Sequence, residues 1–165
     1  MTVMFQDLFA FAMKRNLPSL LSVSGPSFDL GASGKFKVPG SVALGLPDWA
    51  FPRDNIPAKD DSVAMVHCFH FLEHLKGDDA IAMLREIERV LIPGGVLNFC
   101  MPYYNSSIQA QDLTHKSFWT EESFRTIFDN HYYDMAGSWR LKVHFQLICG
   151  IVERNMVLVG QLVRI

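Results

Sequence analysis

Two groups of polar side chains each follow an apolar run that predicts a buried strand. After Val63–Phe69 come His70, Glu73 and His74, and after Val96–Met101 come Tyr103, Tyr104 and Asn105. Ligands of open α/β sheets bind outside the carboxyl ends of the strands, so these side chains mark a candidate site. Of the two histidines, His70 is the expected neighbour of a ligand, whereas His74 is interpreted as a structural hydrogen-bonding residue.

The polar loop Ser106–Thr120 carries a further group of candidates. Asp112 and His115 could remove a proton from a substrate, because a neutral imidazole is a competent base near pH 7. The alternative is that both side chains brace the loop through hydrogen bonds to backbone. Tyr103 and Tyr104 also have a functional and a structural interpretation: they could frame a substrate, or they could pack at a strand end.

A strand–helix–strand unit from Ser62 to Tyr104 must position these groups. Four apolar residues between the two runs recur at helical spacing and predict one buried face: Ala80, Leu84, Ile87 and Leu91. Asp78 and Asp79 predict the N-terminal cap of this helix, and Pro93-Gly94-Gly95 predicts its end. A crossover of this length joins parallel strands in a right-handed unit.

Upstream of this unit, short strands are predicted at Ser27–Leu30 and Ser41–Leu46. The turn Gly31–Lys35 lets backbone approach a ligand, although its spacing matches neither a P-loop nor the full dinucleotide fingerprint. Only Phe36–Gly40 lies between that turn and the second strand, too short a link for an ordinary crossover helix. Either the first helix of the usual unit is missing or the two strands are not parallel neighbours.

Further elements are predicted toward the two ends of the chain. Val3–Lys14 has the pattern of a short amphipathic helix that packs on the domain, or alternatively contacts a partner or covers a substrate. Thr120 is expected to cap a helix whose buried face holds Phe124, Ile127 and Phe128. Arg140–Val152 and Asn155–Arg164 are predicted to pair as an antiparallel hairpin at one sheet edge.

The composition of the 165 residues predicts one globular domain, with 49% apolar and 19% charged residues. A net charge of −2 gives no basic surface for nucleic acid, and no apolar run has the length of a membrane span. Cys68, Cys100 and Cys149 lie far apart in apolar runs, which predicts buried thiols in a reducing, cytoplasmic compartment. Their spacing predicts no metal site.

Taken together, the motifs resemble those of class I S-adenosylmethionine (SAM)-dependent methyltransferases, most closely the type 11 group. The resemblance covers roughly residues 28–128. The motifs that carry it are Asp29-Leu30-Gly31-Ala32-Ser33-Gly34, Ile56-Pro57-Ala58-Lys59-Asp60-Asp61-Ser62, Leu72-Glu73-His74, Pro93-Gly94-Gly95 and Asp112-Leu113-Thr114-His115-Lys116. One branch of the group has a similar Thr-His-Lys loop and a very short link ending in Pro-Gly, as at Pro39-Gly40.

The resemblance implies a Rossmann-like α/β fold: a mostly parallel sheet, helices on both faces, a C-terminal antiparallel hairpin, and a first crossover helix that is shortened or missing. It divides the single domain 1–165 into an N-terminal helix and connector (1–26), a SAM-binding half (27–104) and an acceptor-side part (105–165). The implied activity is methyl transfer from SAM to a small-molecule or glycan-type acceptor. The alternative is a degenerate SAM-fold protein that binds or interacts without catalysis.

The resemblance also implies roles for individual residues. Cofactor binding is expected at Asp29, Gly31, Ala32, Gly34, Asp48, Asn55, Ile56 and His70; acceptor binding at Tyr103, Tyr104 and Lys116; and catalysis at His115 and Asp112; no metal ligand is expected. The chain departs from the family pattern at Ser33, where a glycine is usual, and at Gly45, where an acid normally holds the ribose hydroxyls. Asp48, three residues on, is the expected substitute. A nicotinamide-binding protein is disfavoured by the same missing acid.

Overall fold

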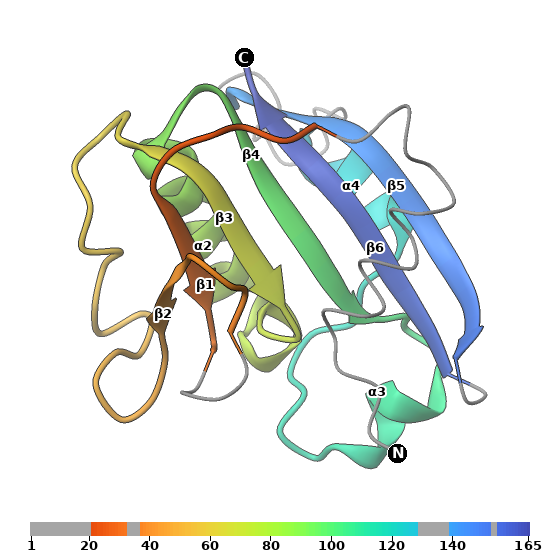
Figure 1. Ribbon diagram of the computed structural model, residues 1–165. Coiled ribbons are helices and arrows are strands. Elements are labelled where there is room, and N and C mark those ends of the chain that lie inside the picture. Colours follow the sequence, from red (N-terminus) through yellow and green to blue (C-terminus); the bar gives the residue numbers. More distant parts are fainter. Residues whose placement is uncertain (1–20, 33–36, 129–138, 153–154) are drawn as a thin grey trace.

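One six-stranded sheet, ordered β2-β1-β3-β4-β6-β5, organises the fold (Figure 1). The computed structural model describes residues 21–32, 37–128, 139–152 and 155–165. The strands are β1 (Ser27–Leu30), β2 (Val42–Leu44), β3 (Val63–Phe69), β4 (Leu91–Pro102), β5 (Leu141–Val152) and β6 (Asn155–Arg164). The predicted strand at Val63–Phe69 and the predicted hairpin are confirmed.

The strands β2, β1, β3 and β4 pair in parallel, with Leu30 of β1 opposite both Leu44 of β2 and Cys68 of β3. Because β1 and β2 are parallel neighbours, the alternative of a missing first crossover helix applies to their short connection. Its described residues, 31–32 and 37–41, contain no helix. The sheet then reverses direction, since β6 is antiparallel to both β4 and β5.

The helix α2 (Gly77–Val90) connects β3 to β4 and buries Ala80, Leu84 and Ile87, as the apolar spacing predicts, together with Met83. The predicted cap is wrong, because Lys76 is the N-cap residue and no side chain caps the helix there. The Ala80 amide already donates to the Lys76 carbonyl, so helical bonding begins before Asp78 and places both aspartates in the first turn. Leu91 and the Pro-Gly-Gly sequence belong to β4.

Two helices follow β4. The loop predicted at Ser106–Thr120 contains the short helix α3 (Ser107–Gln111), whose first turn is closed by the Ser106 hydroxyl accepting from the Gln109 amide. The next helix, α4 (Glu121–Phe128), begins as predicted, with the Thr120 hydroxyl accepting from the Ser123 amide at 3.3 Å. None of the described helices is long and apolar enough to cross a membrane.

The helices α2 and α4 lie on one face of the sheet, behind it in Figure 1. Phe99 of β4 stacks on Phe124 of α4 at 4.4 Å between ring centroids, and both side chains are fully buried. Burying each such ring stabilises the fold by about 1.5–3 kcal/mol. This apolar layer anchors α4 to the central strand β4.

The opposite face carries a buried polar chain from β3 to β6. The Gln161 amide donates to Asn98 at 2.7 Å, and the Asn98 amide contacts His67 Nδ1 at 3.3 Å. Gln161 also holds both backbone groups of Leu21 at 2.9 Å, so the segment 21–26 runs from β6 toward β1. Burial lowers the pKa of His67 to about 4. The helix predicted at Val3–Lys14 lies outside the described residues.

Candidate functional site

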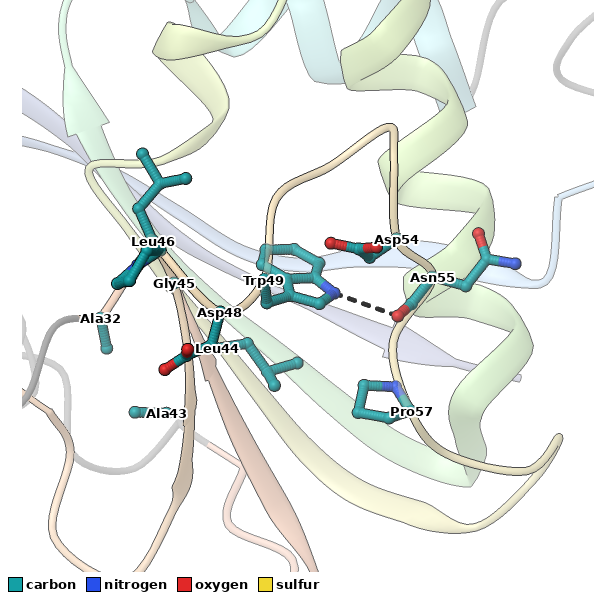
Figure 2. A pocket seen from close by; sticks show the side chains of 11 residues that line it. Ala32, Ala43, Leu44, Gly45, Leu46, Asp48, Trp49, Asp54, Asn55 and Pro57 are labelled. Atoms are coloured by element: carbon teal, nitrogen blue, oxygen red, sulfur yellow. Dashed lines mark hydrogen bonds between the residues drawn. The ribbon is translucent and has the colours of Figure 1, made fainter.

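A pocket of about 600 Å³ opens at the carboxyl end of β2, between that strand and the loop 46–57 (Figure 2). Eleven residues line it: Ala32, Ala43, Leu44, Gly45, Leu46, Pro47, Asp48, Trp49, Asp54, Asn55 and Pro57. The sequence prediction named Ala32, Asp48 and Asn55 among them, and the structure brings these three together. Pockets of this size take drug-sized ligands.

Gly45 stands where the turn after β1 touches the end of β2. The Gly31 amide donates to the Leu44 carbonyl at 2.7 Å, which pulls the turn against β2. A Cβ atom at Gly45 would lie 2.5 Å from the Ala32 carbonyl oxygen, a backbone atom that a side-chain rotation cannot move. The absence of an acid at position 45 therefore has a steric cause.

Gly31 is constrained in a similar way. Its φ of +77° favours glycine, and a Cβ atom there would lie 2.9 Å from the Phe71 ring. The turn after β1 thus approaches both β2 and the segment after β3 more closely than other residues would permit. Gly34 lies outside the described residues.

The loop 46–57 is held in shape by its own hydrogen bonds. The Trp49 indole N–H donates to the Asn55 carbonyl at 3.0 Å (Figure 2), and the Ala50 amide donates to the Asp54 carboxylate at 2.9 Å. Arg53 also binds Asp54, and this hydrogen bond, with that from Ala50, lowers the pKa of Asp54. The Asp54 Oδ2 atom is therefore engaged within the loop.

Asp48 is the other carboxylate of the pocket. Its residue is exposed, and in Figure 2 its carboxylate lies on the side of the pocket that holds Ala32 and Ala43. This is also the side of Gly45. Of the two acids that line the pocket, Asp48 is the more exposed.

Ile56 does not line the pocket but ties the pocket loop to α2. The residue is 2% exposed, and its amide donates to the Glu86 carboxylate of α2 at 2.9 Å. Arg89 binds both Glu86 and the Ile56 carbonyl, so α2 fixes the base of the loop. The resemblance implies a cofactor contact for Ile56, and the residue is absent from those that line the pocket.

Asp29 lies behind the pocket, buried at the end of β1. Its carboxylate accepts a hydrogen bond from the Val38 amide at 2.7 Å and so holds the short link to β2. Burial raises the pKa of Asp29 to about 6, an effect that the Val38 hydrogen bond opposes. Asp29 therefore shapes the turn, and it is absent from the residues that line the pocket.

A second group of predicted residues meets at the end of β3. His70 has a φ of +53°, where the chain turns from β3 into the 3-10 helix η2 (Leu72–His74). His70 Nδ1 lies 3.0 Å from Oε1 of Glu73, a carboxylate with no solvent exposure. His70 thus faces Glu73 and does not line the 600 Å³ pocket.

The loop after α3 is docked on η2 by backbone hydrogen bonds. The amides of Lys116 and Ser117 donate to the Glu73 carbonyl at 2.7 and 3.1 Å. The Ser117 hydroxyl donates to the Leu72 carbonyl and accepts from the Trp119 indole. The residues of 112–117 are therefore held beside those of η2, although more than 35 positions separate them in the sequence.

Asp112 and His115, the predicted catalytic residues, lie close together. His115 Nε2 is 3.8 Å from the Asp112 carboxylate, and its Nδ1 is 3.1 Å from the Gln109 carbonyl. The His115 side chain is only 5% exposed. Hydrogen bonds from Thr114 lower the pKa of Asp112. These contacts favour the interpretation that the pair braces the loop.

The two tyrosines differ in exposure. Tyr103 donates from its hydroxyl to Glu121 at 2.9 Å, and this hydrogen bond raises the pKa of Tyr103. Tyr104 is 48% exposed and packs edge-on against Tyr103 at 5.1 Å. Lys116 is exposed on the neighbouring loop. Tyr104 and Lys116 thus present side chains to solvent.

Sequence reasoning missed several pocket residues, among them Leu46, Pro47 and Trp49. A proline-rich loop with a tryptophan directly after a short strand was the available signal. The spacing of the motifs could not reveal these residues, because the pocket wall depends on the way this loop folds back to Asn55.

Residues 51–99 match a protein family described as a methyltransferase domain. No curated protein matches the chain. Among solved structures, the chain is similar to the N-methyltransferase NodS from Bradyrhizobium japonicum WM9 in complex with S-adenosyl-L-homocysteine (SAH). That likeness has a TM-score of 0.62 at 14% identity and covers 96% of this chain and 86% of NodS.

Two archaeal structures are similar over almost their whole length. One is a SAM-dependent methyltransferase from Archaeoglobus fulgidus, with a TM-score of 0.57, 13% identity and 94% of each chain covered. The other comes from the complex between the Haloferax volcanii Trm112 methyltransferase activator and a protein named as a methyltransferase, with a TM-score of 0.63 and 15% identity. It covers 97% of this chain and 91% of that chain.

Proposed function

We propose that this chain, a class I SAM-dependent methyltransferase, binds SAM in the pocket at the carboxyl end of β2 and methylates a small-molecule or glycan-type acceptor. The observation that carries the proposal is the contact at Gly45. There the turn after β1 and the end of β2 approach so closely that no side chain fits. Such close backbone approach forms one wall of a pocket of about 600 Å³.

The residues of the pocket fit the parts of SAM. Leu46, Trp49 and Pro57 supply apolar walls suited to a purine ring. Position 45 has no carboxylate to bind the ribose hydroxyls, and Asp48 supplies one instead. Asn55 offers an amide side chain, since only its backbone carbonyl is used by Trp49. Asp29 and Gly31 hold the turn that faces the amino-acid part of the cofactor.

SAM, when bound, supplies an electrophilic methyl group to the acceptor. The chain's own contribution is then to orient the acceptor and keep water away. We assign acceptor contact to Tyr104 and Lys116, which are exposed beside η2, with Tyr103 supporting Tyr104 through its edge-on packing. Asp112 and His115 are assigned to hold the loop 112–117 in place, since His115 is bonded to its own loop at Nδ1.

Calorimetric titration with SAH tests the cofactor site. Wild-type protein is expected to bind one SAH, and Asp48→Asn to bind it about tenfold or more weakly, because a charge-assisted hydrogen bond contributes about 1.5–3 kcal/mol. Asp78→Asn, which changes an exposed acid in the first turn of α2, is the matched control and should bind as wild type does.

Two outcomes would contradict the proposal. Wild-type protein that binds neither SAM nor SAH would favour the non-catalytic alternative. Equal SAH affinity in Asp48→Asn and wild type would remove Asp48 from the ribose position. Incubation with methyl-labelled SAM and a panel of small-molecule and glycan acceptors then identifies the acceptor by transfer of label.

A further inference from the structure

Three potential metal ligands converge where η2 meets the loop after α3. Each of Glu73, His74 and His115 offers one ligand atom, and these atoms all lie within 4.8 Å of one another. The rings of His74 and His115 pack edge-on with centroids 4.7 Å apart. Nothing in the proposed cofactor pocket requires this arrangement, because none of the three residues lines that pocket.

Hydrogen bonds fix which nitrogen of each ring carries the proton. The Thr114 hydroxyl donates its only proton to Asp112 at 2.7 Å, so its contact with His74 Nδ1 at 2.9 Å must be a bond accepted from the ring. His115 Nδ1 lies 3.1 Å from the Gln109 carbonyl, to which it can only donate. Both rings therefore keep the lone pair on Nε2.

This hydrogen-bonding pattern is the one that supports metal-binding histidines. A ligating imidazole donates its other N–H to a carbonyl or to a chain ending in a carboxylate, which fixes the ring and its tautomer. His115 uses the Gln109 carbonyl, and His74 reaches the Asp112 carboxylate through Thr114. His74 and His115 thus each keep one ring nitrogen available for a metal ion, and the two residues are arranged as a ligand pair.

Glu73 supplies the negative charge. Its side chain has no solvent exposure, and neither carboxylate oxygen accepts a hydrogen bond from the described part of the chain. His70 Nδ1 approaches Oε1 at 3.0 Å, close enough for an ion pair but without the angles of a hydrogen bond. A buried carboxylate with so little compensation is costly unless a cation binds it.

We propose that Glu73, His74 and His115 bind a divalent transition-metal ion, for which Zn²⁺ is the best match. Two histidines and one glutamate are a known zinc ligand set that leaves a fourth position for water. Tetrahedral zinc with ligands at about 2.0–2.1 Å separates the ligand atoms by about 3.3 Å, so binding closes the 4.8 Å spread by about 1.5 Å.

The site would join two segments that are distant in sequence. Glu73 and His74 belong to η2, and His115 belongs to the loop that carries Lys116. A bound ion would therefore add to the backbone bonds that dock this loop, and hold the acceptor-side edge in one arrangement. This role is independent of SAM binding.

The test begins with chelator-treated full-length protein titrated with ZnCl₂ by calorimetry. Wild-type protein is expected to bind one Zn²⁺ and to unfold at a higher temperature when it is bound. His74→Ala and His115→Ala should each weaken binding by about 100-fold or more. Thr114→Val should weaken it by about 10–100-fold, since it removes only the support of His74. The exposed His144 provides the matched control, and His144→Ala should bind Zn²⁺ as wild type does.

Co²⁺ provides a second readout, because four-coordinate Co²⁺ absorbs strongly in the visible range and octahedral Co²⁺ in water does not. Glu73→Gln should keep the shape of the side chain and lose the band. The proposal is overturned if wild-type protein binds no Zn²⁺, or if His74→Ala and His115→Ala bind it as tightly as wild type. SAH titration of the same samples shows whether such a failure concerns the metal site alone.

Discussion

The two ends of the site are built in different ways. At the turn after β1, backbone meets backbone, and the space is so limited that Gly31 and Gly45 admit no side chain. At η2, the contacts are made by side chains, with Glu73, His74 and His115 drawn together. The first region is limited in shape by backbone contacts, whereas the second offers charge and lone pairs.

The difference indicates which substitutions each region tolerates. A backbone-limited turn is sensitive to added atoms and insensitive to the loss of distant polar groups. A side-chain cluster is sensitive to the loss of single polar atoms, because each removal leaves a buried partner unsatisfied. Substitutions in the two regions should therefore affect SAH binding and loop stability separately.

The largest expected effect concerns the buried carboxylate of Asp29. Its pKa of about 6 exceeds the usual 3.8, so the folded state holds the proton more tightly than the unfolded state. Stability is therefore present at low pH and is lost as the pH rises from about 4 to about 6, by up to about 3 kcal/mol. Asp29→Asn should remove this loss and be more stable than wild type at pH 8.

Urea unfolding of both proteins from pH 3 to pH 8 measures the difference. The buried His67 acts in the opposite direction, losing stability as the pH falls from about 6.5 to about 4, but it is common to both proteins and cancels. The exposed-site variant Asp78→Asn should show no such divergence from wild type. If the difference in the free energy of unfolding between Asp29→Asn and wild type is the same at every pH, Asp29 is not desolvated.

The next effect tests the close contact of the turn. Gly45→Ala places a Cβ atom against the Ala32 carbonyl and should destabilise the fold by about 2 kcal/mol, with weaker SAH binding. Gly77→Ala is the control, because its Cβ meets nothing within 4 Å and it begins α2. Thermal melts that rank the two variants equally would argue against a backbone-limited turn.

The third prediction moves to η2. Ser117→Ala removes the hydroxyl that donates to Leu72 and accepts from the buried Trp119 indole, at a cost of about 1.5 kcal/mol. SAH affinity should be unchanged, since the loop lies outside the pocket. Ser107→Ala, at an exposed position of α3, should alter the free energy of unfolding by about 0.5 kcal/mol or less. Reduced SAH binding in Ser117→Ala would show that the two regions are coupled.

The smallest effect is expected at the tyrosine pair. Tyr103→Phe loses a partly exposed hydrogen bond to Glu121, worth about 0.5 kcal/mol. The variant keeps the ring that supports Tyr104, so the KM for an acceptor should change little. A large rise in KM with unchanged stability would instead assign the Tyr103 hydroxyl to the acceptor.

The sheet was largely predictable from the sequence, and the local details were less so. The run Val63–Phe69 is apolar enough to specify a buried strand, and it forms β3 with those bounds. The helix α3 was missed because Ser107–Gln111 is short and mostly polar. Helical bonding of α2 begins at Lys76, ahead of the two aspartates that had the better capping side chains.

The candidate site was predictable only where it is local in sequence. Asp48 and Asn55 were named from the family resemblance, and both line the pocket. The reason for glycine at position 45 lies in Ala32, thirteen residues earlier, and no local pattern contains it. The proximity of His74 to His115 likewise depends on how the later loop docks.

The bond between Gln161 and Leu21 has a consequence for the order of folding. The two residues are separated by 140 positions, so the backbone of Leu21 gains these partners only after β6 has been synthesised and paired. Contacts of such long range form late and slow folding. During synthesis on the ribosome, the segment 21–26 would thus gain these hydrogen bonds only after the last strand has formed. The same holds for the side-chain oxygen of Asn98, which accepts from Gln161.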